Sequence, residues 1–546
     1  MKLLLGNNAL DYLFDPDIKS KWNRLAGQCQ WATAFQQWEF ISSWYQLYKD
    51  QYQPVLVLEN QEGILTGVFP LAMDQKGWII GAGADQAEYQ VWIYQNENCL
   101  DFVHKAIQLL WNELPLNGIH LKYLPYSTPG LEFNSLRQWK NRTLLKTHPH
   151  PLLLADGEAM SRELGKKNKR EKVNRLKRRG ALNFERITDQ NLFDHIIDDL
   201  ITQCDFRKGA VYGNQLFSDD PFRKPFLIKL FQLGLLHVTL LKLDEEIIAS
   251  NVGVMGNKWV HLQGINTHSP FQAKHSPGIL HFLMLGQLLE KEGFEVFDLT
   301  PGADPYKSML ANQYQEAYEL TIGHPLPILK RKWKQGINKW VKDGLKNKGY
   351  SDRFLKSSKA NFIFKKQQWL HIIKQGPIFY FKKLLLNKNS SESGHLWKIE
   401  KNGGFDSVKQ NGLNLEKNNL KDLLKYDPKG ELVTKQAFLM DCMKRLEEGQ
   451  QVYTYTKNNK LDFLVWLTHQ PQSIIKKSNK LDIKTPSCLI YNFYYRVKGQ
   501  NNGPLTLLAI KDCITHNLDK NILILSNQDY FQNKIEGFEI KPVLEV

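Results

Sequence analysis

Hydrophobic and polar positions alternate along three stretches of the chain, and the same unit recurs in each. A strand of alternating residues is followed by a short polar turn, a second strand, another short turn and a third strand. The first copy starts at Pro54 and has Trp78 in its third strand, whereas the second starts at His237 and has Trp259 in the corresponding place. A third, weaker copy starts at Gln451 with a hairpin. The pattern predicts three antiparallel meanders.

Each meander is followed by a helix and then one further strand. The predicted helices are 99–113, 278–291 and 505–515, and the strands after them are 119–123, 296–299 and 521–525. Helices are also expected before the meanders, at 38–48, at 192–202 with 225–233, and at 435–447. A meander that is covered by helices forms an α+β layer. The pattern therefore predicts an α+β fold with mixed, mostly antiparallel sheets flanked by helices.

The chain has 546 residues, which is enough for roughly three or four domains. Hydrophobic residues make up 42% and charged residues 23%, which is typical of a folded globular protein. The repeats and the charge distribution predict four parts: a first domain at 1–150, a second at 151–325, a basic amphipathic linker at 326–400 and a third unit at 401–546.

Most of the net charge of +16 comes from one stretch, Lys330 to Lys388, which holds 17 Lys and Arg residues and two acidic residues. Bulky apolar residues such as Trp333 and Trp340 alternate with these cations. The pattern fits helices that lie on an anionic membrane surface, and it also fits a linker of solvated basic helices. Both interpretations stay open at the level of the sequence.

Other features of the sequence bear on its location in the cell. The apolar run at the N-terminus is too short for a secretory signal, and no apolar run has the length of a membrane span. Six cysteines lie far apart, without a CxxC pair or a tight Cys/His cluster. We therefore expect a reduced, cytoplasmic protein without a metal, in peripheral contact with the inner face of the cell membrane if 330–388 binds lipid.

A second basic run extends from Ser161 to Gly180 and contains ten cations. Its serine and glycine are typical helix boundaries, so the run is predicted to form a single helix. The cations could hold phosphate groups or could form a solvated face. No nucleic-acid-binding module accompanies the run, so no sequence-specific DNA partner is expected.

Five further segments occur in a recognisable order: FQQWEFISSWY (35–45), LTGVFPLAM (65–73), LKYLPYSTPGLE (121–132), RITDQNLFDHIIDDLITQCDFRKG (186–209) and HSPGILHFLMLGQLLEKEGFEVFDLTPGADPYKSML (275–310). With them, the chain from about Trp22 to Gly323 resembles the FemAB-like and cellulose-biosynthesis-type acetyltransferases of the GNAT superfamily. The resemblance implies two GNAT-like halves joined by a basic helix. The third unit resembles a GNAT unit only loosely and is expected to be degenerate.

Residues Ser276 to Gly278 have the composition of a helix start, because serine can accept a backbone N–H and proline fits the first turn. Gly293 fits the end of the same helix. A helix N-terminus can bind phosphate groups, and in the resembled family this position holds the pyrophosphate of coenzyme A. The resemblance therefore implies acetyl-CoA or another acyl-CoA as donor.

The cofactor-binding residues implied in this way are Gln272, Lys274, His275, Ser276, Gly278 and Asn251. Residues 272–278 retain only a fragment of the usual family pattern, and FemAB relatives use aminoacyl-tRNA as the donor instead. A simple capped helix is the structural alternative.

A loop rich in Gly and Pro follows the strand that is predicted to end at Asp298. In FemAB relatives a lysine in a comparable Tyr-Lys loop lies near the transferred carbonyl, so the resemblance implies that Lys307 stabilises the tetrahedral oxyanion. Asp304 or Asp298 would accept a proton from the attacking group, and Tyr306 would protonate the leaving thiolate or hold the substrate. A helix cap or a salt bridge is the alternative for Asp298.

His261 and Gln263 alternate with apolar residues and so share one face of a predicted strand. A histidine there could act as a base near neutral pH, or it could be a buried structural residue. Asp85 and Tyr89 are predicted to line the acceptor cleft together with Gln263, because their segment resembles the loop after the third strand in the family. Loop packing is the alternative for Asp85 and Tyr89.

These observations predict an acyltransferase that moves an acetyl or other acyl group from acyl-CoA to an amine or hydroxyl of a sugar or of a cell-envelope or exopolysaccharide precursor. A tRNA-dependent aminoacyltransferase acting on a peptidoglycan precursor is the first alternative. The second is a non-catalytic GNAT-like scaffold at the membrane surface.

Overall fold

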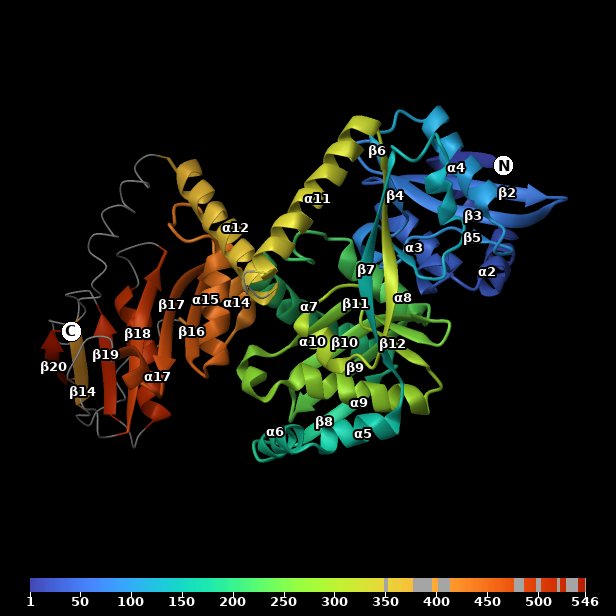
Figure 1. The fold of residues 1–546 in the computed structure, drawn as a ribbon. Helices are drawn as coiled ribbons and strands as arrows, with labels where there is room; N and C mark the ends of the chain where they lie inside the picture. The colour runs from blue at the N-terminus through green and yellow to red at the C-terminus, as the bar shows by residue number, and fades with distance from the viewer. Residues whose placement is uncertain are drawn as a thin grey trace. The chain divides into compact units, whose positions relative to one another are not determined.

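The computed structural model of the protein describes residues 1–347, 352–376, 395–400, 413–475, 486–496, 502–517, 521–526 and 539–545 (Figure 1). The chain divides into two compact units. Unit 1 comprises Met1–Ile201, Phe217–Ser269 and His275–Leu355, and unit 2 comprises Thr202–Leu216, Pro270–Lys274 and Lys356–Val546. Of the predicted lipid-binding stretch, residues 348–351 and 377–388 lie outside the described ranges. The four predicted domain boundaries stay predictions.

Thirteen of the described strands form one mixed sheet in unit 1, and its order is β1-β2-β3-β4-β6-β13-β7-β12-β11-β10-β9-β8, with β5 paired to β3. The bounds are β1 (Lys2–Leu5), β2 (Gln53–Gln61), β3 (Ile64–Met73), β4 (Trp78–Gly81), β5 (Ile93–Tyr94), β6 (Gly118–Pro125), β7 (Thr143–Leu154), β8 (Leu182–Ile187), β9 (Leu236–Leu243), β10 (Glu246–Gly256), β11 (Trp259–His268), β12 (Val296–Asp298) and β13 (Gln313–Gly323). Helices and sheet together confirm the predicted α+β class.

The two predicted meanders of unit 1 are present and equivalent. In each, three antiparallel strands are followed by a helix and a strand that pairs in parallel with the third: β2-β3-β4 then β6, and β9-β10-β11 then β12. Trp78 pairs with Gly118 and Trp259 pairs with Val296, each at the first position of the parallel ladder. The predicted correspondence of the two tryptophans is confirmed.

The two halves exchange their last strands. β7 follows the first half in the chain but pairs with β12 of the second, while β13 follows the second half and pairs with β6 of the first. β7 and β13 also pair with each other over most of their length, which joins both halves into one sheet. The predicted boundary after residue 150 falls inside β7.

The helices of unit 1 connect and cover these strands. They are α1 (Asn7–Leu13), α2 (Ile18–Gln28), α3 (Trp38–Tyr48), α4 (Leu100–Glu113), α5 (Gly157–Gly165), α6 (Lys167–Lys177), α8 (Arg223–Gln232), α9 (Pro277–Lys291), α10 (Pro305–Leu310) and α11 (Pro325–Asn347), with α7 (Gln190–Tyr212) shared between the two units. The short turns of η1 (Ala34–Gln36), η2 (Ala84–Gln86) and η3 (Leu131–Ser135) complete unit 1, and η4 (Pro270–His275) lies between β11 and α9.

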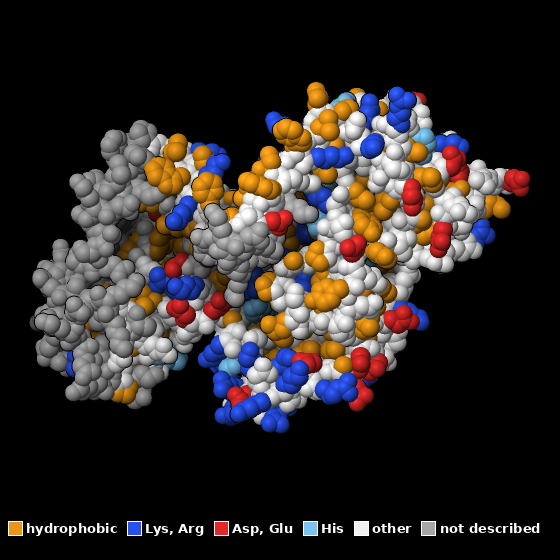
Figure 2. Space-filling view, viewed as in Figure 1, with side chains coloured by type: hydrophobic (Ala, Val, Ile, Leu, Met, Phe, Trp, Pro, Cys, Tyr) orange, Lys and Arg blue, Asp and Glu red, His pale blue; other side chains and the backbone are white. Residues whose placement is uncertain are grey.

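The prediction of a single basic helix from Ser161 to Gly180 is wrong. The structure has two helices, α5 and α6, because the backbone of Lys166 is extended (φ −58°, ψ 137°) directly after Gly165. The side chain of Asp156 caps α5 by accepting the N–H of Ala159, so the helix begins before Ser161. Figure 2 shows Lys and Arg side chains gathered over α5 and α6.

Helix α9 is the central helix of the second half. Its inner side packs on β11, β12 and β7 in a hydrophobic cluster whose buried members include Phe282, Leu285, Phe297 and Leu310. Leu310 belongs to α10, so the same cluster fixes the helix that carries Lys307. The core thus holds the start of α9 and the loop before α10 on one scaffold.

Unit 2 contains a second mixed sheet of seven described strands in the order β15-β16-β17-β18-β19-β14-β20, in which β18 and β19 are parallel. The strands are β14 (His395–Glu400), β15 (Glu416–Lys417), β16 (Gln451–Lys457), β17 (Lys460–Thr468), β18 (Ser487–Tyr495), β19 (Asn521–Ser526) and β20 (Glu539–Glu545). The helices are α12 (Asp352–Lys374), of which residues from Lys356 belong to unit 2, α14 (Leu420–Leu424), α15 (Lys435–Glu447), α16 (Gln472–Ile475) and α17 (Asn502–Thr515).

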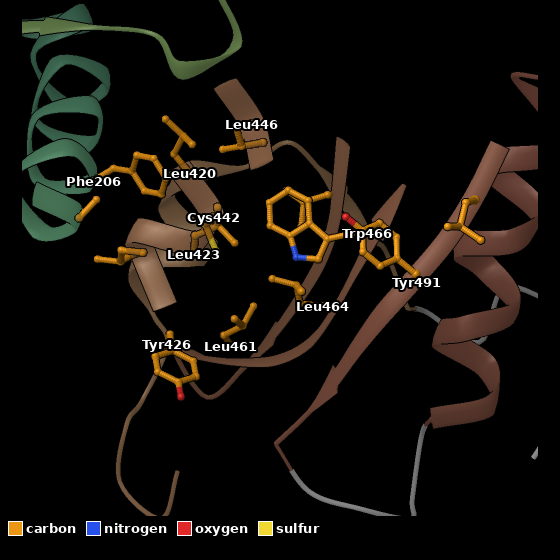
Figure 3. Close-up of a cluster of buried hydrophobic side chains, with 14 of the residues drawn as sticks. Phe206, Leu420, Leu423, Tyr426, Cys442, Leu446, Leu461, Leu464, Trp466 and Tyr491 are labelled. Carbon is orange, nitrogen blue, oxygen red and sulfur yellow. The ribbon is translucent and has the colours of Figure 1, made fainter. Parts of the chain in front are cut away.

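The third predicted copy therefore has the same order of elements as the first two. Its core is a cluster around Trp466 and Leu464, into which Phe206 from α7 inserts together with residues of α14 and α15 (Figure 3). Among the described residues, no helix is long and apolar enough to cross a membrane.

Candidate functional site

A buried polar network joins the two halves of unit 1. The Asp298 carboxylate, at the end of β12, accepts hydrogen bonds from the Tyr89 hydroxyl (2.8 Å), from Nε2 of His150 (2.7 Å) and from Nδ1 of His261 (2.7 Å). It also accepts the backbone N–H of Thr300 at 2.7 Å. The Tyr89 hydroxyl lies 2.7 Å from His150 Nε2 as well. The four network residues, defined as Tyr89, His150, His261 and Asp298, are at most 3% exposed.

The electrostatics of this network fix the protonation of two members. Burial by itself would raise the pKa of Asp298, but the adjacent His150 and His261 hold it well below its usual range. Burial, reinforced by the Asp298 charge, raises the pKa of Tyr89 well above its usual value. At neutral pH the carboxylate is therefore ionised and the phenol protonated, and such a carboxylate is a weak base.

The structure brings together three residues that the sequence analysis assigned to different tasks: Tyr89 to the acceptor cleft, and His261 and Asp298 to catalysis. His150 was missed. It reaches the network because β7 crosses to the second half and pairs with β12, placing Leu152 opposite Asp298 and His150 two residues further on the same face. The run of alternating His and Pro at 148–151 was the only signal available in the sequence.

Lys307 organises the loop between β12 and α10. Its ammonium, on a side chain that is 6% exposed, donates to the carbonyl (3.1 Å) and to the hydroxyl (3.0 Å) of Thr300 and lies 3.5 Å from the Asp304 carboxylate. Burial lowers the pKa of Lys307, and Asp304 opposes that shift. Thr300 has a left-handed backbone (φ 63°), which favours glycine, so these hydrogen bonds help to hold a strained turn.

The other two predicted residues of this loop differ in exposure. Asp304, with a side chain that is 54% exposed, precedes α10 but does not cap it with its side chain. Tyr306 is half-buried and packs against the α9 cluster. The loop therefore presents Asp304 to solvent, whereas Lys307 is turned inward.

The start of α9 has a geometry that differs in one respect from the prediction. The Ser276 side chain caps no backbone N–H, because Ser276 is in a left-handed conformation (φ 53°); instead, its hydroxyl accepts a hydrogen bond from Lys172 Nζ of α6 at 2.8 Å. Pro277 occupies the first turn as predicted. Gly293 has a left-handed backbone (φ 78°) just beyond the helix, which agrees with the predicted helix end.

The surroundings of this helix start leave little room for a side chain. A Cβ atom at Gly278 would lie 3.3 Å from Nδ1 of His268, so a glycine lets the backbone and that imidazole approach closely. Lys172 adds a positive charge at the positive end of the helix dipole. This combination is suited to an anion such as phosphate.

The remaining residues predicted to bind the cofactor differ in the unit to which they belong and in their burial. Gln272 and Lys274 belong to unit 2. His275 is 6% exposed, and Asn251 is fully buried on β10 beside Gly253. The roles of these residues in cofactor binding stay predictions.

Asp85 and Gln263, both of which are predicted to line the acceptor cleft, are in direct contact. The Gln263 amide donates to the Asp85 carbonyl at 2.7 Å, and the Asp85 carboxylate accepts from Arg223 of α8 at 2.5 Å. The Asp85 side chain is 65% exposed. Arg223 was not identified from the sequence, since it lies 138 residues from Asp85.

β11 changes its pairing next to these residues. The register with β10 shifts by two residues between the pairs Gly253–Gly264 and Met255–Val260, so β11 bulges at 261–263. The ladder with β12 ends at His261 and Asp298, while β11 continues to His268. Beyond residue 261, β11 has no partner on its β12 side among the described strands, which leaves a strand edge that an extended ligand can pair with.

No group of three or more His, Cys, Asp or Glu side chains within the described ranges is arranged to hold a metal ion.

Comparison with known protein families finds a match to one part of the chain. Residues 165–308 match the family described as "Acetyltransferase (GNAT) domain". This segment spans Lys172, the start of α9 and Lys307. Among proteins with curated functions, none matches this sequence.

Several solved structures share elements with this chain. FemX is 9% identical, with a TM-score of 0.42, and the match covers 60% of this chain and 99% of FemX. L-PGS from Bacillus licheniformis is 12% identical, with a TM-score of 0.36, over 58% of this chain and 95% of that one. An acetyltransferase of the GNAT family from Colwellia psychrerythraea is 9% identical, with a TM-score of 0.32, over 59% and 98%.

Proposed function

We propose that this chain, which contains a GNAT acetyltransferase domain of the FemAB-like family at residues 165–308, transfers an acyl group from acyl-CoA to an amine or hydroxyl of a sugar or cell-envelope precursor. The observation that carries the proposal is that the domain includes a helix start equipped for phosphate, with Lys172 on Ser276 at 2.8 Å. The repeated strand order supports two GNAT-like halves in unit 1 and a degenerate third in unit 2. The acceptor class is supported by the resemblance of the sequence alone.

Each part of the site has a task in this proposal. Acyl-CoA supplies the acyl thioester. Lys172 and the N-terminus of α9 would hold its phosphates, and the free edge of β11 next to the bulge at 261–263 would orient an extended chain. Asp85 and Gln263 offer polar groups to the acceptor. When donor and acceptor are held side by side, their proximity and orientation supply a large part of the rate acceleration of an acyl transfer.

The network residues act as positioning residues in this proposal, because they are buried and Asp298 is a weak base. They hold the end of β12, and therefore the loop that starts at Thr300, in register with β11. Asp304 is the exposed carboxylate that is available to accept a proton from the attacking group. Lys307 supports the loop through its hydrogen bonds to Thr300. To contact the oxyanion, the ammonium would give up its hydrogen bond to a loop carbonyl and donate to the substrate oxygen instead.

The donor site is tested by measuring binding of acetyl-CoA and release of free coenzyme A in the presence of amino-sugar acceptors. Acetyl-CoA at about 100 times its Kd should stabilise the folded protein by about 2.7 kcal/mol. Lys172→Gln should weaken binding at least tenfold. Lys177→Gln removes an exposed cation from the same helix and serves as the matched control.

Two outcomes would count against the proposal. If acetyl-CoA neither binds nor turns over, but aminoacyl-tRNA serves as donor, the chain is an aminoacyltransferase. If neither donor is used, unit 1 is a non-catalytic scaffold.

We also propose that α11 binds an anionic membrane surface. Trp333 and Trp340 are 78% and 77% exposed, and Ile337 lies between them on the same side of the helix at a spacing of four and three residues. Lys330 and Lys334 lie one turn apart along the helix and are also exposed. Exposed indole rings beside cations match the interface of an anionic bilayer, which favours both.

A further inference from the structure

A cavity of about 470 Å³ opens on unit 1, away from the start of α9. Its walls come from β4, β6, β7 and β13 and from α11, which runs along this part of the sheet (Figure 1). Its lining includes three apolar side chains, Trp78, Ile80 and Leu144, and three cations, Lys146, Arg331 and Lys334. Two carboxylates, Asp74 and Glu319, lie among the polar residues of the lining. The volume falls within the range of sites for small molecules.

The charges of the cavity are not balanced internally. Asp74 accepts the backbone N–H groups of Lys76 and Trp78 at 2.8 and 2.9 Å, which fixes the turn before β4. Glu319 accepts from Lys146 at 2.7 Å and lies 2.9 Å from His148 Nε2. Both carboxylates are therefore engaged within the protein.

Two cations remain for a ligand. The Arg331 guanidinium lies 5.4 Å from the centre of the Trp78 ring, and Lys334 is exposed one turn further along α11. Within the part of the chain that the structure describes, neither pairs with a carboxylate. An arginine fork and a lysine one turn apart can bind one phosphate group together.

The duplication of the fold shows why the cavity is open. Trp78, Ile80 and His120 occupy the register positions that Trp259, His261 and Asp298 occupy in the second half. In the second half, Asp298 and His261 fill this face with the buried network. In the first half, Ile80 and His120 form no such network, and the same face opens as a cavity.

From this geometry we propose that the cavity is a second ligand site, which binds a molecule that carries a phosphate next to a sugar or base ring. Arg331 and Lys334 would bind the phosphate, and Trp78 would supply an apolar wall against which a sugar or base can pack. Lys146 and His150 are four residues apart on one face of β7, so this site and the network are ~13 Å apart along the strand. The proposal does not depend on the acyl-donor site.

The test measures binding of three probes to the full chain by calorimetry: uridine diphosphate, N-acetylglucosamine 1-phosphate and inorganic phosphate. At least one of the two ring-bearing probes should bind, and more tightly than phosphate. The double variant R331Q/K334Q should weaken that binding at least tenfold without changing the melting temperature. Lys76→Gln removes an exposed neighbouring cation that does not line the cavity and should leave binding unchanged.

A second variant separates this site from the donor site, because a nucleotide could also bind at α9. Lys172→Gln should leave the binding of the ring-bearing probe unchanged and should weaken the binding of acetyl-CoA. The proposal is overturned if neither ring-bearing probe binds, if phosphate alone binds as tightly, or if Lys172→Gln abolishes probe binding and R331Q/K334Q does not.

Discussion

Removing a single hydroxyl tests whether the buried network holds the two halves of unit 1 together. Tyr89→Phe leaves the ring in place and takes away the donor that reaches the Asp298 carboxylate at 2.8 Å and lies 2.7 Å from His150. Tyr89 is 1% exposed, so bulk solvent does not reach the position of the lost donor.

The expected cost follows from the charge of the acceptor. A hydrogen bond to a charged group contributes about 1.5–3 kcal/mol to stability, against about 1 kcal/mol for a neutral pair. Tyr45 provides the matched control, because its buried hydroxyl donates only to neutral carbonyls, those of Leu71 and Val55. Tyr89→Phe should therefore lower the free energy of unfolding by about 2–3 kcal/mol, and Tyr45→Phe by about 1 kcal/mol.

Urea unfolding at pH 7, monitored by tryptophan fluorescence, measures the change in the free energy of unfolding for each variant. The change is calculated from the shift of the urea midpoint, provided that the dependence of the free energy on urea concentration is the same as in the unsubstituted protein. A double-mutant cycle with Asp298→Asn then measures the coupling directly and should give at least 1 kcal/mol. The reasoning fails if Tyr89→Phe costs no more than Tyr45→Phe, or if the two substitutions at 89 and 298 are additive.

Three further predictions concern other parts of unit 1. Burial lowers the pKa of His281 to about 4, so between pH 6.5 and 4 the unfolded chain binds a proton at this residue that the folded chain does not. As the pH falls through this window, the free energy of unfolding should therefore decrease by up to about 1.4 kcal/mol per pH unit. The decrease should be less steep in His281→Phe, and urea midpoints measured across this pH range would show it. Gly118→Ala should cost about 1–3 kcal/mol in the same assay, because the new Cβ would lie 2.5 Å from the Trp78 ring and 2.6 Å from the carbonyl of Ile322, and an unchanged midpoint would contradict this packing. Binding to anionic liposomes should weaken with salt and should be lost in W333A/W340A, whereas equal recovery on neutral vesicles would argue against a membrane-binding α11.

Local patterns in the sequence determined the elements of this protein. Alternation predicted the meanders, including the third copy, because side chains of a strand point to opposite faces and one face must be buried. Helix α3 was predicted with its observed bounds, Trp38 to Tyr48. The single basic helix was wrong because a run of cations does not reveal a one-residue break at Lys166.

Tertiary structure alone decided how the site is assembled. His150 meets Asp298 only because β7 and β13 exchange partners between the halves, a pairing between residues 148 positions apart that no local pattern encodes. Likewise, the sequence does not distinguish Lys172 from the nine other cations of its run. Only the packing of α6 beside the start of α9 brings its ammonium to the Ser276 hydroxyl. Periodicity reports which face of an element is buried, whereas the partner that buries it is chosen by the packing of the whole sheet.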